Sequence, residues 1–361
     1  MIVTILVVIL IFSFLVLAHE FGHFITARRN GVEVEEFGIG FPPKVYSKKV
    51  GKTLYSFNAL PLGGFVRLKG EQGESQASDS FASQRAWVKT KILMAGVTMN
   101  LLIAYLVITL LLIIGVPPLT ARDLPSVAGV QPNRQAGNLL VVDVQAKSVA
   151  QQAGLKAGDR LQQINGETIS TPEQLKAAID AQAGKTISIQ FKRGVKEKSH
   201  GITLPQKQAD GALLGVSTVP EQLQSYPAYI APFAAVVILF EMILATLGAF
   251  GGMIVGLFTR AEVSQSVTGP IGITAIFNEV IKYGPNYVLA LVASISLSLA
   301  IINSLPLPAL DGGRLLVVWL QRAGVKITDR TEAIIHTLGF VALIALMIII
   351  SVTDVMRLGG K

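Results

Sequence analysis

Four long stretches of the chain are almost free of charged residues. They cover residues 1–27, 92–120, 283–310 and 333–353. Each is at least as long as the roughly 20 residues that cross a bilayer as a helix, whereas the buried helix of a soluble protein gives a run of only about 10–14. The pattern therefore predicts a polytopic α-helical membrane protein with four spanning helices.

The composition agrees with a membrane protein and excludes several other classes. Hydrophobic residues make up 51% and charged residues 15% of the 361 residues, and the mean hydropathy is +0.55. Soluble proteins contain about 25% charged residues, so a soluble multidomain protein, a disordered chain and a nucleic-acid-binding module are excluded. The chain has no Cys, so any metal ion must be held by His, Asp or Glu.

Residues 117–226 break the apolar pattern with short strand and helix signals. The run from Ala153 to Leu161, followed by Ile164-Asn165-Gly166, resembles the circularly permuted PDZ domains of bacteria. Asn-Gly favours a tight hairpin turn, and Thr171 before Pro172 is typical of a helix start. We therefore predict one inserted α+β PDZ domain that binds an extended peptide or protein tail by strand addition. A generic small α+β domain is the alternative.

The first apolar stretch contains three ionisable residues within five positions. His19, Glu20 and His23 form the pattern H-E-x-x-H, and on a helix positions i and i+4 share one face, so both imidazoles can reach one metal ion. Glu20 can take a proton from a water bound to that metal. Ionisable residues are costly in a membrane span and indicate function. A polar cluster that lines a proton or ion path is the alternative.

A third candidate ligand lies at the end of the third apolar stretch. Pro306 and Pro308 cannot continue a helix, and an extended segment at membrane depth is tolerated only inside protein or along a cavity. Asp311 follows and can supply a carboxylate oxygen. Asn303 can donate a hydrogen bond to a substrate carbonyl or to the oxyanion formed on attack. Helix termination with capping is the alternative for both polar residues.

Taken together, H-E-F-G-H at residues 19–23, the PDZ-like insertion and N-x-x-P-x-P-x-x-D-G from Asn303 resemble the site-2 protease family of intramembrane zinc metalloproteases. The nearest group is the bacterial regulator of sigma-E protease type, here with a single PDZ domain. The resemblance implies one zinc ion per chain on His19, His23 and Asp311, with Glu20 as general base. It also implies that Asn303 aids substrate binding or transition-state stabilisation.

The resemblance extends to the second helix and to the biological role. Residues 95–100 are similar to a family motif, with Val97 where many members have Pro, and an interhelical hydrogen bond is expected for Asn100. The implied function is cleavage of transmembrane segments of single-pass proteins in regulated intramembrane proteolysis. The implied substrates are an anti-sigma factor or signal-peptide remnants, which the PDZ domain screens.

Two other functions are alternatives, a non-enzymatic PDZ scaffold in the membrane and a metal or ion transporter. Glu20 favours the enzyme, because neither a structural nor a transport site needs a base beside its ligands. His200 and His336 have no motif around them and are expected to be ordinary polar residues.

The loop after the first helix contains two strand patterns, residues 53–58 and 65–69, joined through Leu60-Pro61-Leu62-Gly63-Gly64. Such a membrane-associated β-hairpin can hold an unwound substrate in extended form through main-chain hydrogen bonds. A plain cytoplasmic hairpin is the alternative. The candidates for substrate binding are Phe65, Val66, Arg67, Asn303 and Pro306.

Topology follows from charge and parity. Residues 28–91 contain 11 Lys or Arg and 6 Asp or Glu, which places this loop in the cytoplasm and Met1 outside. His19 and Asp311 must meet on one side. The apolar residues 222–259, which contain Glu241, must then not span the membrane. We predict a bacterial inner (plasma) membrane protein with its active site toward the cytoplasm and its PDZ domain outside.

The predicted organisation has eight segments. These are a first transmembrane helix (1–27), a cytoplasmic loop with the hairpin (28–91), a second helix (92–116), the PDZ-like domain (117–226), an interfacial or partly inserted segment (227–282), a third helix (283–313), a cytoplasmic loop (314–332), and a fourth helix with the tail (333–361).

Overall fold

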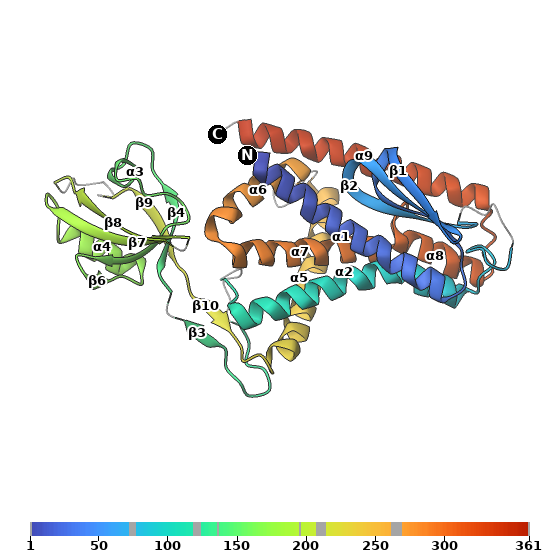
Figure 1. The fold of residues 1–361 in the computed structure, drawn as a ribbon, viewed down its shortest axis with the longest axis horizontal. Coiled ribbons are helices and arrows are strands. Elements are labelled where there is room, and N and C mark those ends of the chain that lie inside the picture. The colour runs from blue at the N-terminus through green and yellow to red at the C-terminus, as the bar shows by residue number, and fades with distance from the viewer. Residues whose placement is uncertain are drawn as a thin grey trace. The chain divides into compact units, whose positions relative to one another are not determined.

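The computed structural model describes residues 2–71, 77–117, 124–135, 137–194, 196–206, 214–260 and 269–359 (Figure 1). Parts of the predicted segments, among them residues 118–123 and 261–268, lie outside the described residues. The chain forms two compact units. We call them the helical unit (residues 1–107, 237–277 and 292–361) and the insertion unit (residues 108–236 and 278–291).

Helices account for most of the structure outside the inserted sheet. The long ones are α1 (Ile2–Arg29), α2 (Ala86–Ile114), α5 (Ala231–Arg260), α6 (Pro270–Tyr283), α7 (Pro285–Ser304), α8 (Asp311–Arg322) and α9 (Asp329–Gly359). Among the described residues, five helices are long and apolar enough to cross a membrane, namely those at 4–29, 86–114, 231–252, 285–304 and 330–356. By length and composition, α5 therefore qualifies beside the four predicted spans.

The chain leaves the helical conformation between α7 and α8, as the two prolines predict. Residues 305–310 form turns, and Ala309 has a φ of 72°, in the left-handed region that is costly for a residue with a β-carbon. Leu310 is extended, and α8 begins at Asp311. The helix break thus places a carboxylate at the first position of a new helix.

Two long strands, β1 (Val34–Val50) and β2 (Thr53–Leu68), form a sheet after α1. Residues 36–39 of β1 pair both with residues 54–57 and with residues 64–67 of β2. The expected hairpin between 53–58 and 65–69 is therefore wrong, because both segments belong to one strand and pair with β1. Residues 60–68, which we call the edge segment, have β1 as their only partner strand in the described part of the chain.

The edge segment packs along α1. Gly63 faces the side chain of Val16, and Gly64 faces that of Leu17. A β-carbon at either glycine would lie less than 3 Å from these side chains, at 2.8 Å and 2.5 Å respectively. The sequence Gly63-Gly64 thus lets an extended strand lie directly on the helix that carries H-E-x-x-H.

The insertion unit contains the predicted α+β domain. Its sheet has the order β8-β7-β5-β4-β9, with β6 beside β5. The strands are β4 (Leu139–Val144), β5 (Arg160–Ile164), β6 (Glu167–Thr168), β7 (Thr186–Arg193), β8 (Lys196–Thr203) and β9 (Val216–Pro220), and β3 (Asn133–Gln135) pairs with β10 (Leu223–Ser225). Two helices, α3 (Val149–Gln152) and α4 (Pro172–Asp180), complete it.

Local signals in the insertion match the structure. The Thr171 hydroxyl accepts a hydrogen bond from the Gln174 N–H and caps α4, as a Thr before Pro predicts. Asn165 and Gly166 both have positive φ, as a tight hairpin between β5 and β6 requires. The alternating apolar residues of β7, together with Leu139 and Leu161, are fully buried and form the core.

Candidate metal centre and active-site cavity

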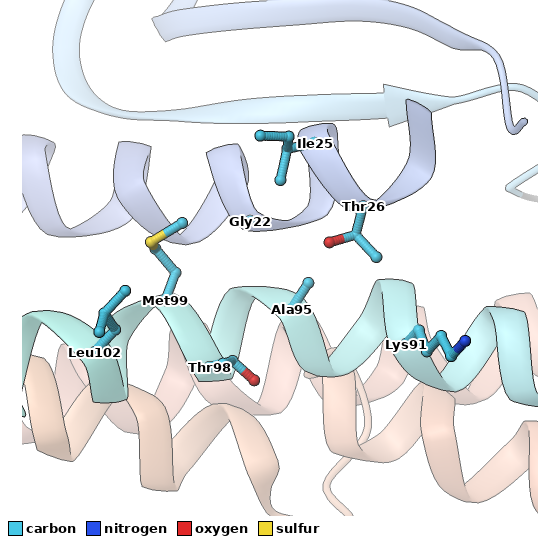
Figure 2. Close-up of a pocket in the computed structure, with 8 residues that line it drawn as sticks. All are labelled: Gly22, Ile25, Thr26, Lys91, Ala95, Thr98, Met99 and Leu102. Carbon is cyan, nitrogen blue, oxygen red and sulfur yellow. The ribbon is translucent and has the colours of Figure 1, made fainter. Parts of the chain in front are cut away.

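Close packing of α1 on α2 sets the geometry of the site. Gly22 of α1 faces Ala95 of α2 beside a small cavity of about 270 Å³ (Figure 2). A β-carbon at Gly22 would lie 2.4 Å from the Ala95 carbonyl oxygen, so only glycine permits this approach. Gly22 is the fourth residue of H-E-F-G-H, and the two candidate ligands on either side of it therefore stand where α1 and α2 are in close contact.

Three ligand candidates meet at one point. The Asp311 carboxylate oxygen Oδ2 lies 3.0 Å from His19 Nε2 and 3.3 Å from His23 Nε2. The two Nε2 atoms lie 3.1 Å apart. Both imidazoles are buried. Among the described residues, this trio is the one group of His, Asp or Glu side chains arranged to hold a metal ion.

The size of this triangle can be tested against a zinc site. Zinc in proteins is tetrahedral, with ligand distances of about 2.0–2.2 Å to His nitrogen and carboxylate oxygen. The edge of such a tetrahedron is then roughly 3.3–3.6 Å, a few tenths of an ångström longer than the shortest measured side. The three donor atoms would therefore fit one zinc ion with little movement.

The outer nitrogens of the two imidazoles differ in their surroundings. His23 Nδ1 lies 2.8 Å from the Ile92 carbonyl oxygen, and because a carbonyl only accepts, Nδ1 carries the proton and leaves the Nε2 lone pair for a metal ion. His19 Nδ1 is buried without a hydrogen-bond partner among the described residues. One candidate ligand is thus oriented by a carbonyl group of α2, while the outer nitrogen of the other has no such contact among the described residues.

Gly96 of α2 is part of the site, although no separate role was expected for it from the sequence. A β-carbon at Gly96 would lie 2.5 Å from His23 Nε2 and 2.6 Å from His19 Nε2. The missing side chain leaves the space in which both ligand nitrogens stand. The resemblance of residues 95–100 to a family motif was the available signal.

Glu20 faces the edge segment. Its Oε2 accepts a hydrogen bond of 3.2 Å from the Val66 backbone N–H. Phe65 and Val66 line a cavity of about 480 Å³, which we call the central cavity, together with Glu20, His23 and Asp311. The carboxylate of the candidate base, two of the ligands and an extended strand therefore border one space.

The central cavity is also lined by a partly buried ion pair and a histidine. Arg314 on α8 pairs with Glu71, and Glu71 Oε2 also accepts a hydrogen bond of 3.1 Å from the Leu68 N–H. His336 on α9 lines the cavity as well, and its Nδ1 accepts a hydrogen bond of 2.9 Å from the Ala309 N–H. The expectation that His336 is an ordinary polar residue missed this contact, because no local motif signals it.

Other predicted residues are not brought to the central cavity. Asn303 is half-buried near the end of α7, and Pro306 is exposed in the turn that follows. The Arg67 side chain is exposed and points to Glu36, with 3.5 Å between its Nη1 and Glu36 Oε2. None of the three lines this cavity. His200 on β8 stacks near the Phe191 ring in the insertion unit.

The Asn100 side chain does not make the expected interhelical hydrogen bond to any described residue. It is fully buried, and both amide atoms have no hydrogen-bond partner among the described residues. An interhelical hydrogen bond does form at this residue, but it runs from the Ser296 hydroxyl to the Asn100 backbone carbonyl at 2.8 Å. The residue joins α2 to α7 through its main chain rather than through its amide.

Comparison with known proteins covers nearly the whole chain. The model of peptidase family M50 matches residues 7–346. A Clostridium perfringens protein assigned as a zinc metalloprotease is 31% identical over 96% of this chain and 97% of its own length. The Bacillus subtilis regulator of sigma-W protease RasP is 27% identical over 98% of this chain and 99% of its own length.

A solved structure matches a smaller part. The PDZ domain of an SdrC-like protein of Listeria monocytogenes has 24% sequence identity, covers 24% of this chain and 90% of its own, and gives a TM-score of 0.21. A score this low does not establish a common fold. The PDZ assignment therefore depends on the strands, turns and helices of the insertion unit itself.

Proposed function

The chain belongs to peptidase family M50 and is a zinc-dependent membrane endopeptidase, and from this premise we propose that His19, His23 and Asp311 hold the zinc ion and that Glu20 is the general base. The observation that carries the proposal is the convergence of the three donor atoms, all within 4.8 Å of one another. When bound, zinc supplies Lewis-acid polarisation of a peptide carbonyl and makes a nearby water more acidic.

Glu20 moves the proton in the proposed reaction. It takes the proton of the water that attacks the peptide carbonyl and then returns it to the amine nitrogen that leaves, so that one carboxylate serves as base and acid. The Val66 N–H holds Glu20 Oε2 on the side of the central cavity. This hydrogen bond fixes the orientation of the carboxylate before a substrate enters.

The edge segment is the proposed substrate platform. A peptide bond inside a helix is shielded by the helix, and a substrate must therefore be unwound before cleavage. The open side of residues 60–68 can add such a segment as a further strand, with Phe65, Val66 and Arg67 as its contacts. Asn303 and Pro306, close to Asp311 in the chain, are proposed to contact the substrate from the turn after α7.

The proposed substrates are transmembrane segments of single-pass proteins in regulated intramembrane proteolysis. The name of the Bacillus subtilis relative, a regulator of a sigma factor, supports an anti-sigma factor among them. The remnant of a cleaved signal peptide has the same chemistry, a single apolar segment. Residues 117–226, within the insertion unit, are proposed to form a PDZ domain that binds a peptide or protein tail and screens substrates.

The proposed topology has four spans, α1, α2, α7 and α9, in the plasma membrane, with the PDZ-like domain of residues 117–226 outside and the metal centre toward the cytoplasm. His19 and Asp311 lie on one side because their atoms are 3.0 Å apart, and parity then requires that α5 does not span. Within the helical unit, α5 packs on α2 and α7 through an apolar cluster around Ala104, Leu297 and Ile301.

This topology can be tested with single cysteines, because the natural chain contains none. Lys282, exposed at the end of α6, is expected outside the cytoplasm. A Lys282→Cys variant should react with a membrane-impermeant thiol reagent in intact cells. Labelling only after permeabilisation would place α6 in the cytoplasm and make α5 a span.

The catalytic assignment is tested by Glu20→Gln in the full-length protein. This variant should bind zinc and a model transmembrane peptide as the wild type does, yet fail to cleave the peptide, since an amide cannot take the proton. The conservative Glu20→Asp variant, which keeps a carboxylate on a shorter side chain, serves as a comparison and should keep part of the activity. Cleavage by Glu20→Gln at the wild-type rate would refute the role of Glu20.

A further inference from the structure

The turn before Asp311 contains one backbone N–H whose hydrogen-bond acceptor lies on another helix. Within residues 305–310, the N–H groups of Leu305, Leu307 and Leu310 bond to carbonyl oxygens of the turn or of the end of α7. The Ala309 N–H instead donates to His336 Nδ1 on α9, at 2.9 Å. Ala309 has a φ of 72°, a conformation that residues with a β-carbon rarely adopt unless their surroundings hold it.

A second contact from the same face of α9 holds the same turn. Gly339 lies three residues after His336 and hence on one side of the helix. A β-carbon at Gly339 would lie 2.2 Å from the β-carbon of Pro308 and 2.9 Å from its carbonyl carbon. One face of α9 thus supports Pro308 by close packing and Ala309 by a hydrogen bond, two adjacent residues just ahead of Asp311.

We propose that His336 is a positioning residue of the metal centre, which acts through the Ala309 N–H to fix the turn that brings Asp311 to His19 and His23. The inference rests on the proposed function in that it takes Asp311 as a zinc ligand. Because a backbone N–H only donates, Nδ1 must accept and is unprotonated in this contact. What α9 supplies is therefore a fixed acceptor at one position, not a charge.

Loss of the contact between His336 and Ala309 is expected to lower the zinc affinity of the metal centre. A binding site has to hold its groups within about 0.5 Å of their working positions, and Asp311 is only two residues from Ala309. Loss of an outer contact that orients a metal ligand typically costs about 10–100-fold in metal affinity. We expect a loss of this size when the acceptor on α9 is removed.

A pair of substitutions separates the acceptor from the rest of the side chain. In His336→Asn the amide oxygen takes the place of Nδ1 and can still accept from Ala309, whereas His336→Leu fills the space without an acceptor. Leu338→Ala, at an exposed residue of the same helix, is the matched control. The measurement is zinc affinity of the full-length protein in detergent, by competition with a chelator, together with the visible spectrum of the cobalt-substituted protein.

His336→Leu should bind zinc about 10–100-fold more weakly and show an altered cobalt spectrum, while His336→Asn and Leu338→Ala should match the wild type. Gly339→Ala places a methyl group against Pro308 and should also weaken zinc binding. Because it perturbs the same turn through a different residue, it keeps the proposal testable if His336→Leu fails to fold. Wild-type zinc affinity in His336→Leu would overturn the proposal, and so would an equal loss in His336→Asn.

A separate variant tests whether Asp311 is a zinc ligand, independently of the role of His336. An Asp311→Ala variant should lose zinc far more severely than any substitution on α9. If Asp311→Ala kept wild-type zinc affinity, the proposed function would be wrong at Asp311 irrespective of His336. If Asp311→Ala lost zinc but His336→Leu did not, only the inference about His336 would fall.

Discussion

Gly96 of α2 stands directly against the ring of His19, and a β-carbon on Gly96 would lie 2.6 Å from the Nε2 atom that faces Asp311. The same β-carbon would lie 2.5 Å from His23 Nε2. Real β-carbons do not approach other atoms so closely, so the helix α2 must carry glycine here for the two imidazoles to converge.

Gly96→Ala is therefore expected to abolish the metal centre without unfolding the protein. The added methyl group must push at least one imidazole away, which should lower zinc affinity at least tenfold and remove cleavage activity. Zinc binding by chelator competition is the measurement. Gly248→Ala in α5, where a β-carbon meets nothing within 4 Å, is the control and should bind zinc normally. Normal zinc binding in Gly96→Ala would contradict the prediction, because it would show that α1 and α2 can move apart without loss of the metal centre.

Removal of zinc should destabilise the folded protein. A ligand that binds only the native state raises its stability by mass action, and without the ion three buried donor atoms are left facing one another. A chelator should lower the Tm of the wild type by several degrees, and added zinc should restore it. The Asp311→Ala variant should show no such response. An equal shift in that variant would place the stabilising zinc elsewhere.

The backbone N–H of Val66 is expected to matter more than its side chain. Val66→Pro removes the donor that holds Glu20 Oε2 at 3.2 Å, because proline has no backbone N–H. It should lower kcat at least tenfold while zinc affinity stays unchanged. Val66→Ala keeps the N–H and should remain within a few-fold of the wild type. Equal activities of the two variants would exclude a role for this hydrogen bond.

The β1–β2 sheet carries a pH-dependent contribution to stability through Glu36. Burial alone would raise the pKa of this carboxyl, but the Ser56 hydroxyl, Lys44, whose Nζ lies 2.9 Å from Oε1, and the nearby Arg67 together outweigh it and lower the pKa below its ordinary value. The ionised form therefore stabilises the fold. This contribution is complete above the unfolded pKa and disappears as the pH falls through the folded one.

Glu36→Gln should consequently cost about 1 kcal/mol at pH 7, a modest figure because Lys44 and Arg67 are partly exposed to solvent. The difference in Tm between the variant and the wild type should shrink as the pH falls below about 4. Thermal unfolding in detergent at both pH values is the measurement. A difference that grew on acidification would contradict the assigned sign.

Local chemistry made much of this protein predictable. The spacing of His19 and His23 places them on one face of a helix whatever surrounds it, because the α-helix repeats every 3.6 residues. Pro306 and Pro308 end α7 because proline lacks the N–H that a helix requires. The turns and caps of the insertion follow from Asn165-Gly166 and Thr171 in the same way. These features depend on residues within a few positions of one another.

Contacts between segments that are far apart in the chain could not be predicted from such local patterns. The two strand patterns in residues 53–69 were visible, yet their pairing with β1 instead of with each other depends on how a bent strand packs on α1. His336 and Gly96 carry no motif chemistry of their own. Their roles arise because α9 supports the turn at Ala309 and because α2 approaches α1 at Gly22.

The apolar helices, the H-E-x-x-H pattern, the helix break before Asp311 and the inserted domain thus follow from the amino-acid order alone, since each is set by composition or by short-range backbone chemistry. The approach of Asp311 to 3.0 Å from His19, the contact of Val66 with Glu20 and the support of α9 for the turn before Asp311 depend on the three-dimensional packing. These contacts join residues far apart in the chain, and the packing of side chains between helices, not any local preference, selects them.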